Sequence, residues 1–225
     1  MSSSPWGHQL LGVAAVGGWL GLLSALAIWV RGRWPEQREW SRKVVHIGCG
    51  PVMLIAWAWG IERWIAVSAA VVITLLAALN HRMRVLPAIE DVNRHSYGTI
   101  AYGASISLLL LLYWDRQPIA AVVGVLVMAI GDGLAGLLGP LVTSPSWQVF
   151  QQRRSLVGTA VMALASLLVL VVMASFGPAP ATLWLLAIAA VATALEQCAV
   201  LGIDNLSVPI SVGWLWQALS QQGSA

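Results

Sequence analysis

The chain has 225 residues, of which 59% are hydrophobic and only 9% are charged, and its formal net charge is +3. A soluble domain of this size needs a charged outer surface, so this composition excludes that class. The small net charge gives no reason to expect a nucleic-acid partner. Several apolar runs reach the length that crosses a hydrocarbon core, so the sequence predicts an all-α, polytopic helix bundle in a lipid bilayer.

Apolar runs of about 17 to 25 residues mark the expected spans, and we expect about seven of them, with six to eight compatible with the pattern. In chain order they are Leu10–Val30, Val44–Trp59, Trp64–Leu79, Gly98–Trp114, Ile119–Leu141, Leu156–Phe176 and Leu183–Ile203. A shorter apolar tail, Val208–Leu219, is expected to lie in the interface or to re-enter the membrane. Since no repeat or linker composition divides the chain, residues 1–225 are predicted to form one domain.

The basic residues are distributed unevenly among the connections between these runs. Only Arg63 and Arg116 lie in the second and fourth connections. The other ten lie in the first, third and fifth connections: Arg31, Arg33, Arg38, Arg42, Lys43, Arg82, Arg84, Arg94, Arg153 and Arg154. By the positive-inside rule, this asymmetry predicts that the odd-numbered connections are cytoplasmic and that the N-terminus lies outside.

Two carboxylates lie at membrane depth, where inserting a charge costs about 2.5–3.5 kcal/mol, so each needs a function or a buried partner. Asp132 stands in the glycine-rich segment 131–136, where glycines allow the helix to unwind or a neighbour or ligand to approach closely. Glu196 lies toward the cytoplasmic end of its span. For Glu196, an ion pair with an arginine of a basic connection that ties helices together stays an open alternative.

The segment 131–136 also reads G-x-G-x-x-G, the pattern of dinucleotide-binding folds. That fingerprint needs a soluble strand, turn and helix, with an acidic residue about 20 positions further on. The next carboxylate after Asp132 is Glu196, and the chain contains no G-x-x-x-x-G-K-[ST] sequence. The sequence therefore predicts no soluble nucleotide-binding fold.

A basic and hydroxyl-rich segment, 151–159, precedes and begins an apolar run. Arginine guanidinium groups match phosphate oxygens, and the exposed amides of a helix N-terminus add positive potential, so the segment is a candidate anion site. A helix N-cap by Ser155 beside two arginines that only set topology is an equal alternative.

A second basic cluster, Arg42-Lys43-Val44-Val45-His46, places Arg42 and His46 four residues apart, on one face of a helix just inside the membrane. Under the predicted topology, the candidate polar residues gather on or just below the cytoplasmic face: Arg42, Lys43, His46, Tyr97, Asp132, Arg153, Arg154, Glu196 and Asp204. That arrangement suits a site where a water-soluble anion meets a lipid.

In order and spacing, these motifs resemble those of the dolichol kinase and phytol kinase family of polyprenol kinases. The resemblance is carried by Arg42-Lys43-x-x-His46-Ile47, Tyr97-Gly98, Gly131-Asp132-Gly133-x-Ala135, Arg154-Ser155-x-x-Gly158-Thr159, Glu196, Asp204-Asn205 and Pro209. The chain is most similar to the phytol kinases of photosynthetic bacteria. The resemblance implies a kinase that phosphorylates phytol or a related prenyl alcohol with CTP or another nucleoside triphosphate, feeding tocopherol and isoprenoid salvage.

The resemblance also implies roles for individual residues. The catalytic residues would be Asp132, Arg154 and Glu196, and Mg²⁺ would be held by Asp132 and Asp204. The phosphates and the nucleotide would be bound by Arg42, Lys43, His46, Gly133, Arg153, Ser155, Gly158, Thr159 and Asn205. The chain departs from the family where many relatives carry Asp and Arg, because it has Gly136 and Pro140. Without the second aspartate, the segment offers one carboxylate where two could share a metal.

Two other functions are compatible with parts of the pattern. A cytidylyltransferase that makes a CDP-lipid has the same need for CTP, a metal and a membrane substrate. A transporter would use Asp132 and Glu196 as coupling sites near the membrane midplane, and it would need a second charged cluster reachable from the outer face. The sequence shows no such cluster, so the kinase interpretation is preferred.

Overall fold

The computed structural model describes residues 5–83, 97–150 and 152–221, and these form a helical bundle with one small hairpin. The N-terminal helices are α1 (Pro5–Arg33), α2 (Arg38–Ala58), α3 (Arg63–Met83) and α5 (Gly98–Tyr113). One continuous helix follows, made of α6 (Pro118–Leu126), the π-helical turn η1 (Val127–Asp132) and α7 (Gly133–Leu138). The last three are α8 (Leu156–Met173), α9 (Thr182–Cys198) and α10 (Asp204–Ser220). The all-α class is confirmed.

Some of these helices are long enough to span a membrane, and others are shorter. Four helices are long and apolar enough to cross a membrane: Trp6–Arg33, Arg63–Met83, Pro118–Leu138 and Leu156–Met173. Gly98–Tyr113 and Thr182–Cys198 are apolar but shorter. Every expected apolar run is therefore helical, whereas the number of about seven spans stays a prediction. Two of the arginines used for the topology, Arg84 and Arg94, lie outside the described residues.

Helix α6 forms the centre of the bundle, and all its residues from Ile119 to Leu126 are buried. Helix α10 crosses it at very short range: a Cβ atom at Gly124 would lie 2.4 Å from the Pro209 main-chain oxygen. Small residues allow membrane helices to approach this closely. Of the two alternatives for the tail, its packing argues against an interfacial position, because α10 lies inside the bundle with Trp216 fully buried; a re-entrant position stays a prediction.

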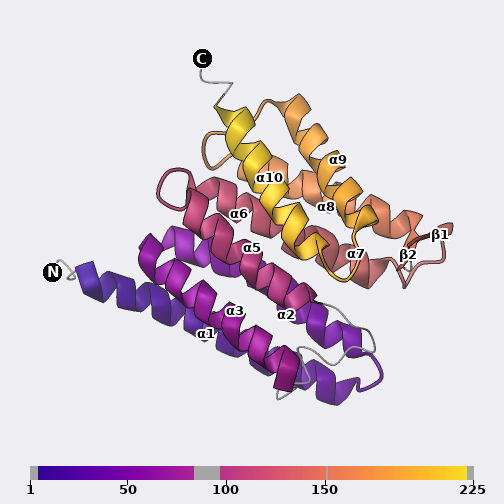
Figure 1. The fold of residues 1–225 in the computed structure, drawn as a ribbon, viewed down its shortest axis with the longest axis horizontal. Coiled ribbons are helices and arrows are strands. Elements are labelled where there is room, and N and C mark those ends of the chain that lie inside the picture. Colours follow the sequence, from indigo (N-terminus) through magenta and orange to yellow (C-terminus); the bar gives the residue numbers. More distant parts are fainter. Residues whose placement is uncertain (1–4, 84–96, 151, 222–225) are drawn as a thin grey trace.

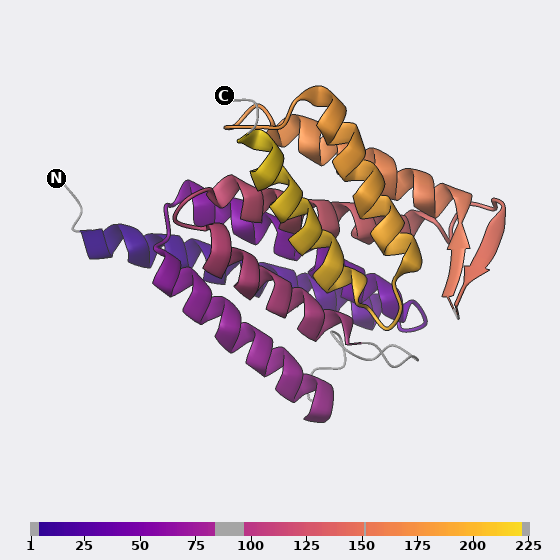
Figure 2. The same ribbon diagram turned by 45° about the horizontal axis from the view of Figure 1, so that its top comes forward.

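The bundle has two distinct ends (Figures 1 and 2). The start of α1 and the end of α10 lie at one end, and the β1–β2 hairpin lies at the other. At the first end, Gln9 Nε2 donates a hydrogen bond to the Gly60 main-chain oxygen at 3.0 Å. At the second end, the Tyr97 amide donates to the Leu201 main-chain oxygen at 3.0 Å. The second connection, with Gly60, and the third connection, with Tyr97, therefore lie at opposite ends of the bundle. The predicted topology depends on this alternation.

The hairpin pairs β1 (Ser146–Val149) with β2 (Gln152–Ser155) in antiparallel register, with Trp147 opposite Arg154. The sequence did not predict it, because neither strand has an alternating apolar pattern. Helix α8 follows directly, and Ser155 Oγ accepts a hydrogen bond from the Gly158 amide at 3.2 Å. The predicted N-cap is confirmed. The two arginines, however, lie on a strand, where neighbouring side chains point to opposite faces.

Candidate active site

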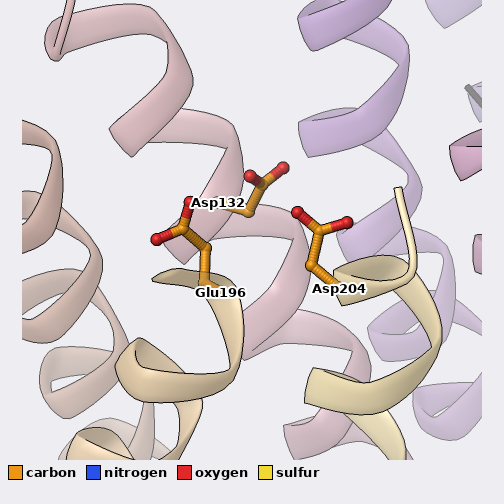
Figure 3. A group of neighbouring side chains, drawn as sticks. All are labelled: Asp132, Glu196 and Asp204. Atoms are coloured by element: carbon orange, nitrogen blue, oxygen red, sulfur yellow. The ribbon is translucent and has the colours of Figure 1, made fainter. Parts of the chain in front are cut away.

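Three carboxylates from distant parts of the chain converge at the hairpin end of the bundle. Asp132 ends η1, Glu196 lies near the end of α9, and Asp204 begins α10. One carboxylate oxygen from each lies within 4.8 Å of the other two, and Figure 3 shows the three side chains facing one another. Like charges at this range repel, so the arrangement needs cations to hold it.

Lys43 supplies the first cation, from α2. Its Nζ lies 2.7 Å from Asp132 Oδ2 and 3.0 Å from the Asp132 main-chain oxygen. The two side chains are only 11% and 13% exposed, and a buried charge of this kind is costly unless it is paired. Gly136 makes room for the lysine, because a Cβ atom there would lie 2.5 Å from Lys43 Cε.

His46 lies behind Asp132, one helical turn after Lys43. Its Nε2 lies 3.2 Å from both Asp132 Oδ2 and the Met128 main-chain oxygen. Since both partners accept hydrogen bonds, we assign the proton to Nε2. The ring also stacks on Tyr102, with centroids 4.6 Å apart. Met128 belongs to η1, so His46 connects the π-helical turn to the carboxylate that ends it.

Arg154 pairs with Glu196. Its Nη1 contacts Glu196 Oε1, and its Nη2 donates to the main-chain oxygens of Glu196 at 2.6 Å and Ala199 at 3.2 Å. Gln197 Nε2 donates to the other carboxylate oxygen, Glu196 Oε2, at 2.8 Å. Both oxygens of Glu196 are therefore engaged. The pair ties β2 to α9, as the open alternative for Glu196 proposed, and it does so at the edge of the carboxylate cluster.

A cavity of about 1180 Å³ lies over this cluster, between α2, α7, the hairpin and the connection from α9 to α10. Most of the predicted site residues line it: Arg42, Lys43, Asp132, Arg153, Arg154, Ser155, Gly158, Thr159, Glu196, Asp204 and Asn205. His46 and Gly133 do not line it. A Cβ atom at Gly133 would lie 2.3 Å from Ile47 Cγ1, so that glycine serves the packing of α7 on α2. The glycines thus allow close approach within a continuous helix, and η1 is not unwound.

Sequence reasoning missed some of the cavity residues. Gln197 and Glu39 line the cavity, and each has a simple signal, because Gln197 follows Glu196 and Glu39 precedes Arg42 by three residues on α2. Within the part of the chain that the structure describes, four buried atoms of residues that line this cavity have no hydrogen-bond partner: Arg42 Nη1, Arg154 Nε, Gln197 Oε1 and Asn205 Oδ1. Two donors and two acceptors therefore remain without a hydrogen bond that a ligand would complete.

The chain is 46% identical over 176 residues to a phytol kinase from Synechocystis sp., with 76% of each chain covered. The chain belongs to the phytol kinase family. This membership confirms the resemblance that the motifs indicate and assigns the chain to the kinases. No protein-family model matches the chain, and no solved structure matches it.

The carboxylates of this cluster can be compared with the ligands that a divalent cation prefers. Mg²⁺ prefers oxygen ligands and usually takes one or two protein carboxylates plus substrate phosphates. Asp132, Glu196 and Asp204 offer carboxylate oxygens within 4.8 Å of one another. Glu196 and Asp204 supply the additional carboxylates that the glycine at position 136 does not, so these residues fit a divalent cation.

Proposed function

We propose that the chain transfers the terminal phosphoryl group of CTP, or of another nucleoside triphosphate, to the hydroxyl of phytol or a related prenyl alcohol. The convergence of Asp132, Glu196 and Asp204 on a cavity lined by basic side chains supports this proposal, together with the identity to a phytol kinase. The product would be a prenyl monophosphate, which would feed tocopherol and isoprenoid salvage.

In phosphoryl transfer, the protein mainly positions the reactants and stabilises charge. Asp132 and Asp204 would hold Mg²⁺, which when bound neutralises phosphate charge and orients the nucleotide. Alternatively, Asp132 would accept the proton of the alcohol. Lys43 neutralises Asp132 in the free protein, and its Nζ lies on the cavity, within reach of an incoming phosphate.

The remaining cavity residues would bind the nucleotide. Arg42 Nη1 is buried, lies 3.8 Å from Glu39 Oε2 and makes no hydrogen bond to the described residues, so it would bind a phosphate oxygen. Ser155 and Thr159 bring hydroxyl groups to the start of α8, and Gly158 lines the cavity there without a side chain that would block it. Asn205 Oδ1 would accept a hydrogen bond from a donor group of the nucleotide. Arg154 would act mainly by fixing Glu196 at the edge of the site.

The experiment is an assay of the purified protein with phytol, geranylgeraniol and farnesol against labelled CTP and ATP. We expect a prenyl monophosphate and a nucleoside diphosphate. Release of pyrophosphate with a CDP-lipid would instead identify a cytidylyltransferase. Movement of a solute across the membrane with no turnover of the nucleotide would favour the transporter.

The proposed location of the site is the cytoplasmic face, with the N-terminus outside. The ten-to-two distribution of basic residues supports this orientation. Single cysteines at positions 154 and 116 should be labelled from opposite sides of the membrane, with position 116 reached from outside. Labelling of both from one side would contradict the proposed topology.

A further inference from the structure

Two bulky residues have a left-handed backbone conformation. Phe150 has φ of 52° and Leu201 has φ of 54°, and no other non-glycine residue among the described ones has a positive φ. This region is unfavourable for large side chains and is normally occupied by glycine. Such outliers persist where the surrounding structure enforces them, and they concentrate at functional sites.

Both residues lie on the rim of the charged cavity, although they come from different segments. Phe150 follows β1, and Leu201 lies between α9 and α10. Their side chains are 71% and 55% exposed, and Val142, from the connection before β1, lines the same cavity and is 50% exposed. We call Phe150, Leu201 and Val142 the apolar rim. It places exposed apolar side chains beside the charged groups of the cavity, and two of them stand at backbone positions that are unfavourable for bulky residues.

Hydrogen bonds hold the rim in place. The Leu201 main-chain oxygen accepts from the Tyr97 amide at 3.0 Å. On the other side, β2 pairs with β1 up to Val149 and Gln152, next to Phe150. Arg154, on β2, donates to the Ala199 main-chain oxygen at 3.2 Å, two residues before Leu201. The guanidinium that pairs with Glu196 therefore also ties the two rim segments together.

We propose that the apolar rim binds the isoprenoid chain of the lipid alcohol while its hydroxyl reaches the carboxylate cluster. The inference rests on the proposed function and extends it to the tail of the substrate. The lining of the cavity includes the buried Glu196 and Asp204 together with the exposed apolar rim, so it can take a molecule with one small polar end and a long hydrocarbon tail. In this arrangement, the rim residues set the preference for long-chain over short-chain alcohols.

The kinetic test compares phytol with the shorter geraniol in Phe150→Ser and Leu201→Ser. We expect kcat/KM for phytol to fall roughly tenfold, with a smaller fall for geraniol, because loss of apolar contacts costs more for the longer tail. The KM for the nucleotide should not change. Phe176→Ser is the matched control, since Phe176 is the other phenylalanine of the chain, is 62% exposed, and lies at the end of α8 away from the cavity. It should leave both alcohols unaffected.

Leu201→Gly separates binding from a structural role. Glycine adopts the left-handed conformation without strain, so the thermal stability of this variant should be equal to or higher than that of the wild type. Its kcat/KM for phytol should nevertheless fall as in Leu201→Ser. Unchanged kcat/KM for phytol in both Leu201 variants and in Phe150→Ser would overturn the proposal. Equal losses for phytol and geraniol would also overturn it, because they would indicate contact with bulk lipid.

A second measurement does not depend on catalysis. A photoreactive diazirine analogue of phytol should label peptides that contain Phe150 and Leu201, and free phytol, but not added phospholipid, should compete. Labelling elsewhere in a protein that phosphorylates phytol would overturn the rim while leaving the proposed function intact. Labelling at the rim in a protein that phosphorylates no prenol would overturn the proposed function while leaving the rim as a binding site for the lipid.

Discussion

Lys43 contacts Asp132 at two points: its Nζ lies 2.7 Å from the Oδ2 atom and 3.0 Å from the main-chain oxygen. The lysine therefore fixes both the carboxylate and the helix end that carries it. In the free protein, the ammonium group neutralises a carboxylate that lies close to Glu196 and Asp204. A residue that displaces Lys43 should disturb the geometry of all three carboxylates.

Gly136→Ala tests this relationship. The new Cβ atom would lie 2.5 Å from Lys43 Cε and 2.6 Å from Nζ, so the lysine would have to move. We expect kcat to fall by on the order of 10- to 100-fold, because small displacements of reacting groups have effects of this size. The measurement is steady-state kinetics of prenol phosphorylation in detergent or nanodiscs.

The control for this prediction is Gly21→Ala, because a Cβ atom at Gly21 would meet no atom within 4 Å. Gly21 lies in α1, where alanine is a better helix former than glycine, so the control should keep full activity and equal or higher thermal stability. If Gly136→Ala behaved like Gly21→Ala, the close contact with Lys43 would have no functional consequence.

Asp132→Asn should abolish activity while the protein still inserts and folds. The change removes one of the three converging carboxylates and leaves Lys43 without its anionic partner, which should also lower the melting temperature. The measurements are turnover at saturating Mg²⁺ and thermal melting in detergent. Asp115→Asn is the control, since Asp115 is 58% exposed and pairs with Arg63 at the opposite end. Near-normal turnover in Asp132→Asn would assign the residue a structural role.

Much of the fold could be predicted because the hydropathy of a segment indicates whether it contacts lipid or the core of the bundle. The run Gly98–Trp114 became helix Gly98–Tyr113, and Leu156–Phe176 became Leu156–Met173. Helix α2 extends to Arg38, well before the predicted start at Val44, because charged residues at a helix end do not contribute to hydropathy. The sequence could not decide how the tail 208–219 is placed, because its packing depends on Gly124 in a distant helix.

The sequence predicted which residues belong to the candidate site better than it predicted how they are arranged. Inserting an ionisable side chain at membrane depth costs free energy, so such a residue needs a function or a partner. For this reason Asp132 and Glu196 could be selected from the sequence. For Glu196 the sequence offered an arginine of a basic connection as partner, but the partner of Asp132 could not be selected, because Lys43 reaches it only through the packing of α2 on η1. Nor could the sequence separate Arg153 from Arg154. That choice depends on an unpredicted strand, in which neighbouring residues face opposite sides.

The position of His46 predicts a difference between two of its variants. His46→Gln keeps an amide with two N–H groups, one for Asp132 Oδ2 and one for the Met128 oxygen, and kcat should stay within about fivefold of the wild type. His46→Leu removes the hydrogen bond to the Met128 oxygen and the polar contact to Asp132 Oδ2, so kcat should fall on the order of 100-fold. Neither variant should change the KM for the nucleotide. A raised nucleotide KM in His46→Leu with unchanged kcat would instead support the phosphate contact that the sequence predicted.

Arg154 and Arg153 should respond differently to the same conservative change. Arg154 reaches Glu196 Oε1 and two main-chain oxygens, whereas Arg153 is exposed and its Nε donates to Ser146 Oγ at 3.2 Å. Lysine keeps the charge but lacks the planar fork that serves several acceptors at once. We therefore expect Arg154→Lys to lower kcat and the affinity for the nucleotide by roughly tenfold or more, and Arg153→Lys to be silent.

The measurements for this pair are kcat and KM for CTP in each variant, with thermal melting as a check of the fold. Arg153→Lys is the internal control, because it makes the same chemical change one residue away and preserves the charge that sets topology. Arg154→Ala should have the larger effect, since it removes the cationic partner of the buried Glu196 and leaves it, among the described residues, with the hydrogen bond from Gln197. If Arg154→Lys kept full activity while Arg154→Ala lost it, the charge would be what matters. Full activity in Arg154→Ala would remove the residue from the site, and the ion pair would then serve only to join β2 to α9.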